Sequence, residues 1–196
     1  MIQPATNAAL TRNLSMVVAG AAGGVGATTV AALLAAALTA RTGLPPKITD
    51  HTGGAIADRV TTASPTATHS VHDAGPHAAN IAGLTAAPDA CPVIVAATTA
   101  DSADTALFAL QRFTATPGGK QDDPTRPQRG VIVINSTSPR KPPHDTSAHL
   151  NRIAPGAVVI ALPWDPALAL PGPVDPATTN PRTAQSVAQI LQAFGV

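Results

Sequence analysis

Short apolar runs alternate with helical patterns along this chain, and this alternation limits the possible fold more than any other feature. Four runs are rich in β-branched and aliphatic residues and end at turn-forming or polar residues, as buried strands do. They are Met16–Gly20, Val93–Ala97, Gly130–Asn135 and Ala157–Leu162. Two weaker strand candidates, Lys47–Asp50 and His69–Asp73, each end in an acid. Strands that alternate with helices predict an α/β fold, with one doubly wound, mostly parallel sheet and helices on both faces.

The helical patterns lie between and after these runs. The segment Thr28–Arg41 is rich in small residues, and the following Gly43 fits a helix C-cap. Asp101 and Asn180 are expected to be the N-caps of two later helices. In the last helix, apolar side chains recur at helical spacing, as expected for a face that packs on the sheet. They are Val187, Ile190, Leu191 and Phe194.

Composition favours a single domain, predicted to span residues 16–196 after a flexible tail at residues 1–15. The chain has 196 residues, of which 44% are hydrophobic, enough for one sizeable core. A net charge of +1 gives no strong field for nucleic acid or an anionic membrane. Aromatic residues make up 2%, with no tyrosine, so stacking platforms for single-stranded nucleic acid are not expected. The single cysteine, Cys91, cannot form an intramolecular disulfide and is predicted to pack in the core.

The same features predict a soluble, cytoplasmic protein without a membrane anchor. No segment reaches the roughly 20 unbroken apolar residues that a spanning helix needs. The polar tail lacks the basic start and apolar run of a secretion signal. The terminal segment Thr183–Val196 has no basic face that would hold it on a membrane.

A glycine-rich turn follows the first predicted strand directly and opens the first predicted helix. It reads Gly23, Gly24, Val25, Gly26, Ala27, Thr28 and Thr29. Glycines let the backbone fold around a phosphate with its N–H groups pointing inward, and the helix N-terminus adds positive potential there. The Thr28 hydroxyl is suited to Mg²⁺. A tight turn in an alanine-rich protein is the simpler alternative, but the strand before, the helix after and the acids ending later strands favour a phosphate loop.

With these parts in this order, the chain resembles the MinD/ParA group of P-loop ATPases over nearly its whole length after the tail. The loop of that family reads KGGVGKTT where this chain reads AGGVGATT over residues 22–29. The segment His69–Pro76 resembles the family's switch II strand and turn. Val131–Asn135 resembles the strand whose terminal asparagine reads adenine, and Ala161–Asp165 the late turn that lies against the base.

The resemblance implies ATP and Mg²⁺ as cofactors and assigns candidate roles to single residues. The phosphates would lie on the glycine-rich turn, from Gly23 to Thr29. Thr28 and Asp73 would hold Mg²⁺. Asn135, Pro163 and Trp164 would contact the base, although packing in the core or in a lid is an equally weighted interpretation of this only tryptophan.

The departures from the family pattern concern its catalytic groups. Ala22 and Ala27 stand where the family has its two lysines, which makes this a deviant Walker A loop. In Asp50–Gly54, which resembles switch I, Thr52 replaces the acid that helps to position the attacking water, while Asp50 remains as a candidate catalytic residue. Loss of a cationic group typically slows phosphoryl transfer by about 10² to 10³. Fast hydrolysis of ATP is therefore not expected.

The GGVGATT form resembles the CpaE/TadZ branch, atypical ATPases that organise pili and secretion machines by docking. The leading hypothesis is an ATP-binding protein with weak or no hydrolysis that acts as a homodimeric scaffold or switch. Its unidentified protein partner would belong to positioning, partitioning, secretion or pilus-type machinery. One alternative is an active ATPase completed by a partner subunit, or by Lys47 or Arg59 of this chain. Another is a pseudo-ATPase interaction module that binds no nucleotide.

Two further groups of residues receive simpler interpretations. The cluster of His69, His72 and His77 completes no common metal-ligand set, so surface or supporting roles are expected. Four basic residues flank the predicted strand at Gly130–Asn135, and solvated loop charge is favoured over a DNA-binding patch. They are Arg126, Arg129, Arg140 and Lys141.

Overall fold

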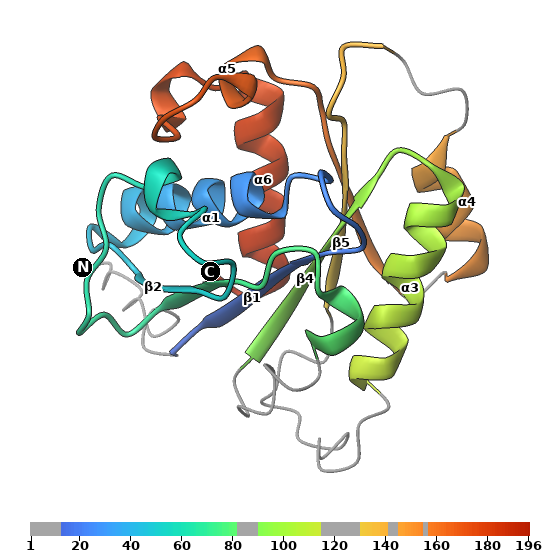
Figure 1. Cartoon of the computed structure of the whole chain (residues 1–196), viewed down its shortest axis with the longest axis horizontal. Helices are drawn as coiled ribbons and strands as arrows, with labels where there is room; N and C mark the ends of the chain where they lie inside the picture. The colour runs from blue at the N-terminus through green and yellow to red at the C-terminus, as the bar shows by residue number, and fades with distance from the viewer. Residues whose placement is uncertain (1–12, 82–89, 115–129, 141–144, 155–156) are drawn as a thin grey trace, which may run out of the picture.

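The computed structural model describes residues 13–81, 90–114, 130–140, 145–154 and 157–196, and these form one six-stranded sheet (Figure 1). The strands are β1 Ser15–Gly20, β2 Lys47–Asp50, β3 Ser70–Asp73, β4 Ala90–Ala97, β5 Val131–Asn135 and β6 Val158–Leu162. Their order across the sheet is β2-β3-β1-β4-β5-β6, and every neighbouring pair is parallel. The predicted α/β class is confirmed, with an all-parallel sheet.

Parallel pairing brings the ends of all six strands to one edge of the sheet. The strands end at Gly20, Asp50, Asp73, Ala97, Asn135 and Leu162. In neighbouring strands Asp50 lies beside Asp73, and Ala97 lies beside Asn135. This carboxyl edge therefore gathers polar residues that are far apart in the sequence.

Two helices, α1 (Ala27–Thr42) and α6 (Pro181–Ala193), cover one face of the sheet. Alternate strand residues such as Met16 and Val18 point to this face, since successive side chains of a strand point to opposite sides. Gly43 ends α1 in a left-handed conformation with φ 74°, and its N–H donates to the Thr39 carbonyl, as predicted for the C-cap.

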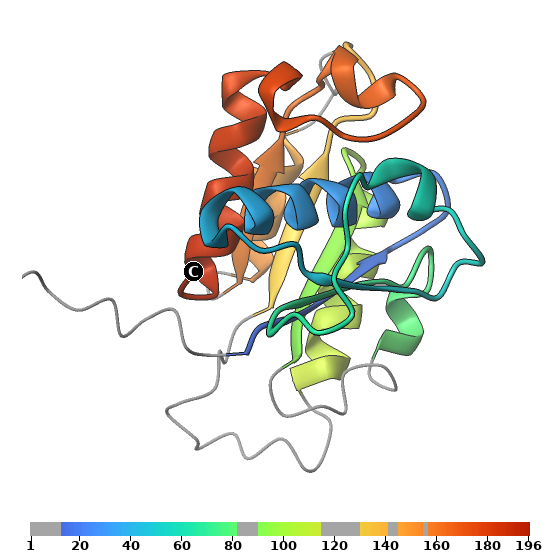
Figure 2. The same cartoon turned by 90° about the vertical axis from the view of Figure 1, so that its left-hand side faces the viewer.

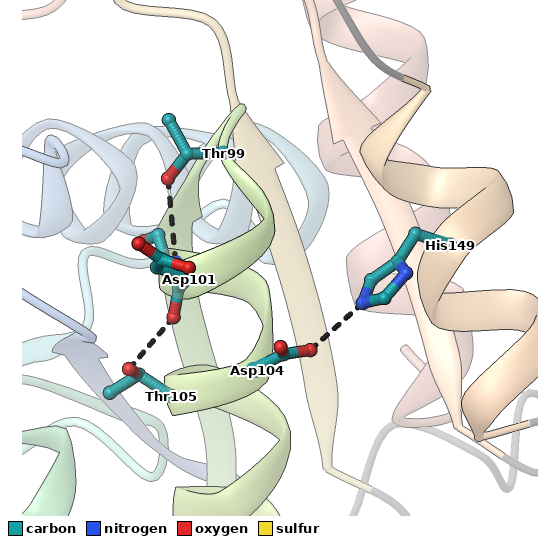
Figure 3. A network of polar contacts seen from close by, with 6 residues as sticks. Thr99, Asp101, Asp104, Thr105 and His149 are labelled. Atoms are coloured by element: carbon teal, nitrogen blue, oxygen red, sulfur yellow. Dashed lines mark hydrogen bonds and ion pairs between the residues drawn. The ribbon is translucent and has the colours of Figure 1, made fainter.

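The opposite face is covered by α3 (Ala100–Thr114) and α4 (Thr146–Ile153). These helices share a core with Val17, Ala19 and Ile94. At their surface, His149 Nε2 lies 2.9 Å from Asp104 Oδ1, which links the two helices (Figure 3). Both faces of the sheet are therefore covered, as the alternating pattern predicted.

Short helical turns complete the chain. The 3₁₀ helices η2 (Ala57–Arg59), η3 (Ala78–Asn80) and η4 (Pro176–Thr178) and the one-turn helix α5 (Pro166–Ala169) lie in connections. The segment that carries α5 lies on the same side of the sheet as α1 and α6 (Figure 2). Arg59 contacts both this segment and Thr29, which lies at the carboxyl-edge end of α1.

Several boundaries differ from those predicted. Asp101 is not an N-cap, because α3 already begins at Ala100 and the Thr99 hydroxyl accepts the Ser102 N–H at 3.4 Å. The helix α4 was not predicted. Asn180 does cap α6, since its side chain accepts the Arg182 N–H. Residues 1–12 of the predicted tail lie outside the described residues.

Two smaller expectations concern the core and the membrane. Cys91 is fully buried in β4, as predicted for a packing residue. In the segments that the structure describes, no helix is both long and apolar enough to span a bilayer.

Candidate functional site

The glycine-rich turn leaves β1 at the carboxyl edge of the sheet and leads into α1. At its start, Gly20 N donates to the Gly75 carbonyl at 2.7 Å and Ala21 N donates to the Val95 carbonyl at 2.8 Å. These bonds tie the start of the turn to the loop after β3 and to β4, on the two sides of β1. Residues 22–24 are exposed, so the main chain at this point is open to a ligand.

The side chain of Asn135 is hydrogen-bonded to the main chain of the turn. Its Nδ2 donates to the Val25 carbonyl at 2.9 Å, although the two residues are 110 positions apart. The next residue, Gly26, has φ 88°, and a Cβ added there would clash with Nδ2 of Asn135. Glycine is therefore favoured at this position both by backbone conformation and by space.

The N-terminus of α1 has no side-chain cap. Gly26 occupies the N-cap position in a left-handed conformation, and the first turn contains no acid. Val30 N is the first amide bonded within the helix, to the Gly26 carbonyl at 3.0 Å. The amides of Ala27, Thr28 and Thr29 precede it and have no intrahelical acceptor. By contrast, aspartate or asparagine side chains cap α4, α5 and α6.

Asp73 ends the strand beside β1 and is fully buried. Its Oδ1 accepts the Gly75 N–H at 3.0 Å, which shapes the turn after β3. Its Oδ2 has no hydrogen-bond partner among the described residues. A buried polar atom without a partner is costly, so this oxygen marks a place where a cation or a water would be stabilised.

Asp50 uses both of its oxygens within its own loop. Oδ1 accepts from the Thr52 amide and hydroxyl, each at 2.6 Å, and Oδ2 accepts the Gly54 N–H at 2.7 Å. Burial raises the pKa of Asp50, but hydrogen bonds from the Thr52 side chain and from the amides of Thr52, Gly54 and Ile56 outweigh it and hold the pKa below its ordinary value. In this arrangement Asp50 orders the loop after β2.

The residues predicted to contact the base lie at the end of β5 and directly after the end of β6. Asn135 and Leu162 are paired in register, and Ser136 N donates to the Leu162 carbonyl at 2.9 Å. Pro163 and Trp164 follow directly and are half-buried. The structure thus brings Asn135 to the same sheet edge as these two residues, while its amide is already bonded to the glycine-rich turn.

Sequence reasoning gave no separate role to Asp165, which is 3% exposed. Its Oδ1 accepts the Ala167 N–H at 3.1 Å and its Oδ2 accepts the Asn180 N–H at 2.7 Å. The carboxyl group therefore fastens the segment after Trp164 to the start of α6. An Asp-Pro pair at a helix start was the available signal, since such residues cap helices.

Cationic side chains are absent from the loop itself. Ala22 is exposed and Ala27 is buried. Lys47 is the first residue of β2, at the end of the sheet opposite to the turn, so it does not replace them. Arg59 does reach the first turn of α1, where its Nη2 donates to the Thr29 hydroxyl at 3.3 Å.

The three clustered histidines do not converge. His69 is 8% exposed, and its Nδ1 accepts the Leu14 N–H at 3.3 Å; burial lowers its pKa. The ring of His72 lies beside that of His51, with Nδ1 and Nε2 3.4 Å apart. His77 is exposed. Where the chain is described, no group of three or more His, Cys, Asp or Glu side chains is arranged to hold a metal ion.

Of the basic residues around β5, Arg140 is exposed, while Arg126, Arg129 and Lys141 lie outside the described residues.

The edge of the sheet thus combines main-chain donors with an unpartnered carboxyl oxygen. Free amides at the start of a helix favour an anion, and a buried carboxyl oxygen favours a hard cation such as Mg²⁺. The sequence matches no protein-family model and no curated protein sequence.

Proposed function

We propose that this protein binds a nucleotide, Mg-ATP, at the carboxyl edge of the sheet and hydrolyses it slowly or not at all. The observation that carries the proposal is the pairing of two neighbouring features. One is the open, uncapped turn from Gly23 to Thr28. The other is the buried Oδ2 of Asp73, without a partner among the described residues. A phosphate group and its metal ion would satisfy both.

In this proposal each group has a limited task. The amides from Gly24 to Thr28 bind the phosphate oxygens, and the Thr28 hydroxyl and Asp73 hold Mg²⁺ or its water ligands. Pro163 and Trp164 contact the base. The metal neutralises phosphate charge when it is bound.

Slow hydrolysis follows from the side chains around the turn. Positions 22 and 27 are alanine, so no lysine stabilises the charge that develops on a transferring phosphoryl group. Thr52 does not supply a carboxylate, and Asp50 is committed to the Thr52 and Gly54 donors. Nucleotide binding without rapid turnover suits a MinD/ParA-like scaffold or switch. We propose a cytoplasmic homodimer that docks on a protein of positioning, partitioning, secretion or pilus machinery.

Titration calorimetry with Mg-ATP and Mg-ADP tests the binding step. We expect saturable heat that Thr28→Ala and Asp73→Asn each weaken by about tenfold or more, the size expected when a charge-assisted contact is lost. Thr39→Ala, near the other end of α1, is the matched control and should bind like the wild type. No heat and no thermal shift at millimolar nucleotide would instead support an interaction module without a ligand.

A measurement of ATP turnover tests the alternative of an active ATPase. We expect phosphate release at or near background for the protein alone. Hydrolysis clearly above background that Thr28→Ala abolishes would contradict the scaffold proposal and favour an active ATPase. Light scattering with and without Mg-ATP then measures whether a dimer forms and whether it needs nucleotide.

A further inference from the structure

Arg59 joins three parts of the molecule that lie far apart in the sequence. Its Nη2 donates to the Thr29 hydroxyl at 3.3 Å and to the Leu168 carbonyl at 2.8 Å. Its Nη1 donates to the carbonyls of Leu170, at 2.5 Å, and Gly172, at 3.2 Å. The guanidinium is therefore held between the first turn of α1 and the segment around α5.

The charge on this guanidinium has no acidic partner among the described residues. None of their carboxylates lies within 4.0 Å of the guanidinium nitrogens, and the ion pair found among these residues joins His149 to Asp104. Arg59 is half-buried, so water screens it less than it screens an exposed arginine. The carbonyl oxygens around it offset the charge only in part, because they carry dipoles and no net charge.

Its position adds to a potential that is already positive. Thr29 is the third residue of α1, within the first turn, and a helix N-terminus carries about half a positive charge. A half-buried cation beside an uncapped helix start is favourable when an anion lies close to both.

We infer that Arg59 is the electrostatic partner of the phosphates at this site and supplies from within the chain part of the positive charge that Ala22 and Ala27 do not. The inference rests on the proposed nucleotide site and names a residue outside the glycine-rich turn. Arg59 acts on the bound anion across Thr29, over a separation on the order of one helical turn, which is shorter than the screening length of about 8 Å in physiological salt.

A purely structural role makes different predictions. If Arg59 only fastens the segment at residues 168–172, its loss lowers the affinity for every nucleotide by the same factor at every salt concentration. If its charge acts on the phosphates, the loss grows with the number of phosphates and shrinks in high salt, where the screening length falls to about 3 Å at 1 M.

The experiment compares Arg59→Gln and Arg59→Lys with the wild type in titrations with ATP, ADP and AMP, in 0.1 M and 1 M NaCl. In low salt we expect Arg59→Gln to lower the affinity for ATP by about tenfold and the affinity for AMP by no more than about threefold. Both losses of affinity should be smaller in high salt. Arg59→Lys keeps the charge and should retain most of the ATP affinity. Arg41→Gln is the matched control, because it removes one positive charge from the last turn of the same helix and should change nothing.

The outcomes separate the two proposals. Suppose that the wild type binds ATP. If Arg59→Gln binds ATP equally well, or if its affinities for ATP and AMP fall by equal factors at both salt concentrations, the role of Arg59 is overturned while the nucleotide site stands. If the wild type binds none of the three nucleotides, both proposals fail. Thermal unfolding without nucleotide checks that the variants fold. If Arg59→Gln does not fold, Arg59→Lys decides alone, and a large loss of ATP affinity in that folded variant contradicts the charge role.

Discussion

The side-chain amide of Asn135 donates a hydrogen bond of 2.9 Å to the main-chain carbonyl of Val25, and so joins the end of β5 to the turn between β1 and α1. The two strands are not neighbours, since β4 lies between them. Asn135 is 7% exposed, so the bond is shielded from water. The shape of the glycine-rich turn thus depends on a residue that lies more than a hundred positions later in the sequence.

We expect Asn135→Ala to lower the free energy of unfolding by about 1 to 3 kcal/mol, because it leaves the Val25 carbonyl without its donor in a buried place. Urea unfolding followed by the fluorescence of Trp164, the only tryptophan, measures the change. Asn151→Ala, on the exposed side of α4, is the control and should stay within about 0.5 kcal/mol of the wild type. Equal stability of Asn135→Ala and the wild type would show that the bond contributes nothing.

Gly26→Ala should be more damaging than Gly24→Ala, although both glycines have positive φ, 88° and 76°. Alanine at either position meets a backbone cost of about 1 to 2 kcal/mol. At Gly24 the new methyl group finds nothing within 4 Å, whereas at Gly26 it clashes with Asn135. Adding Asn135→Ala should relieve that clash, so the double variant should be more stable than the sum of the two single effects indicates. Strict additivity in urea unfolding would contradict this coupling.

The sequence was sufficient to predict the elements that local rules determine. The strand at Lys47–Asp50 has the predicted bounds, and Gly43 and Asn180 cap the helices expected of them. The start of β4 was missed because Pro92 cannot donate to a neighbouring strand. It is tolerated there because β4 pairs with β5 only from Val93 onward.

Within the candidate site, the sequence predicted positions better than contacts. Parallel pairing made it possible to predict that Asp73 and Asn135 end strands at one edge of the sheet. The bond from Asn135 to Val25 and the contacts of Arg59 with residues 168–172 join segments more than a hundred positions apart. No local pattern encodes such contacts, because they depend on how the connections fold over the sheet. For the same reason Asp165 was missed as the link to α6.

Asp73→Asn should separate stability from ligand binding. The replacement keeps the shape of the side chain and one acceptor for the Gly75 N–H, and it removes a buried acidic group whose Oδ2 has no partner among the described residues. We expect the ligand-free variant to be as stable as the wild type or more stable by about 1 kcal/mol, while the stabilisation by Mg-ATP is lost. Thermal unfolding with and without Mg-ATP measures both. A large destabilisation of the ligand-free variant would show that the carboxyl group is needed for the fold itself.

Stability should fall as the pH drops through the range in which His69 becomes protonated. Burial lowers the pKa of His69 from its ordinary 6.5, and its Nδ1 accepts the Leu14 N–H at 3.3 Å, so the folded state favours the neutral ring. The unfolded chain then binds a proton more readily than the folded one, and the stability that this histidine contributes is complete above about pH 6.5 and is lost as the pH falls through the lower folded value. His69→Asn keeps an acceptor near the Leu14 amide without a titrating ring, so its urea midpoint should change less than that of the wild type between pH 7 and about pH 5. His77→Asn, at an exposed position, should follow the wild type. If His69→Asn and the wild type lost stability in parallel over this range, another group would be responsible for the pH dependence.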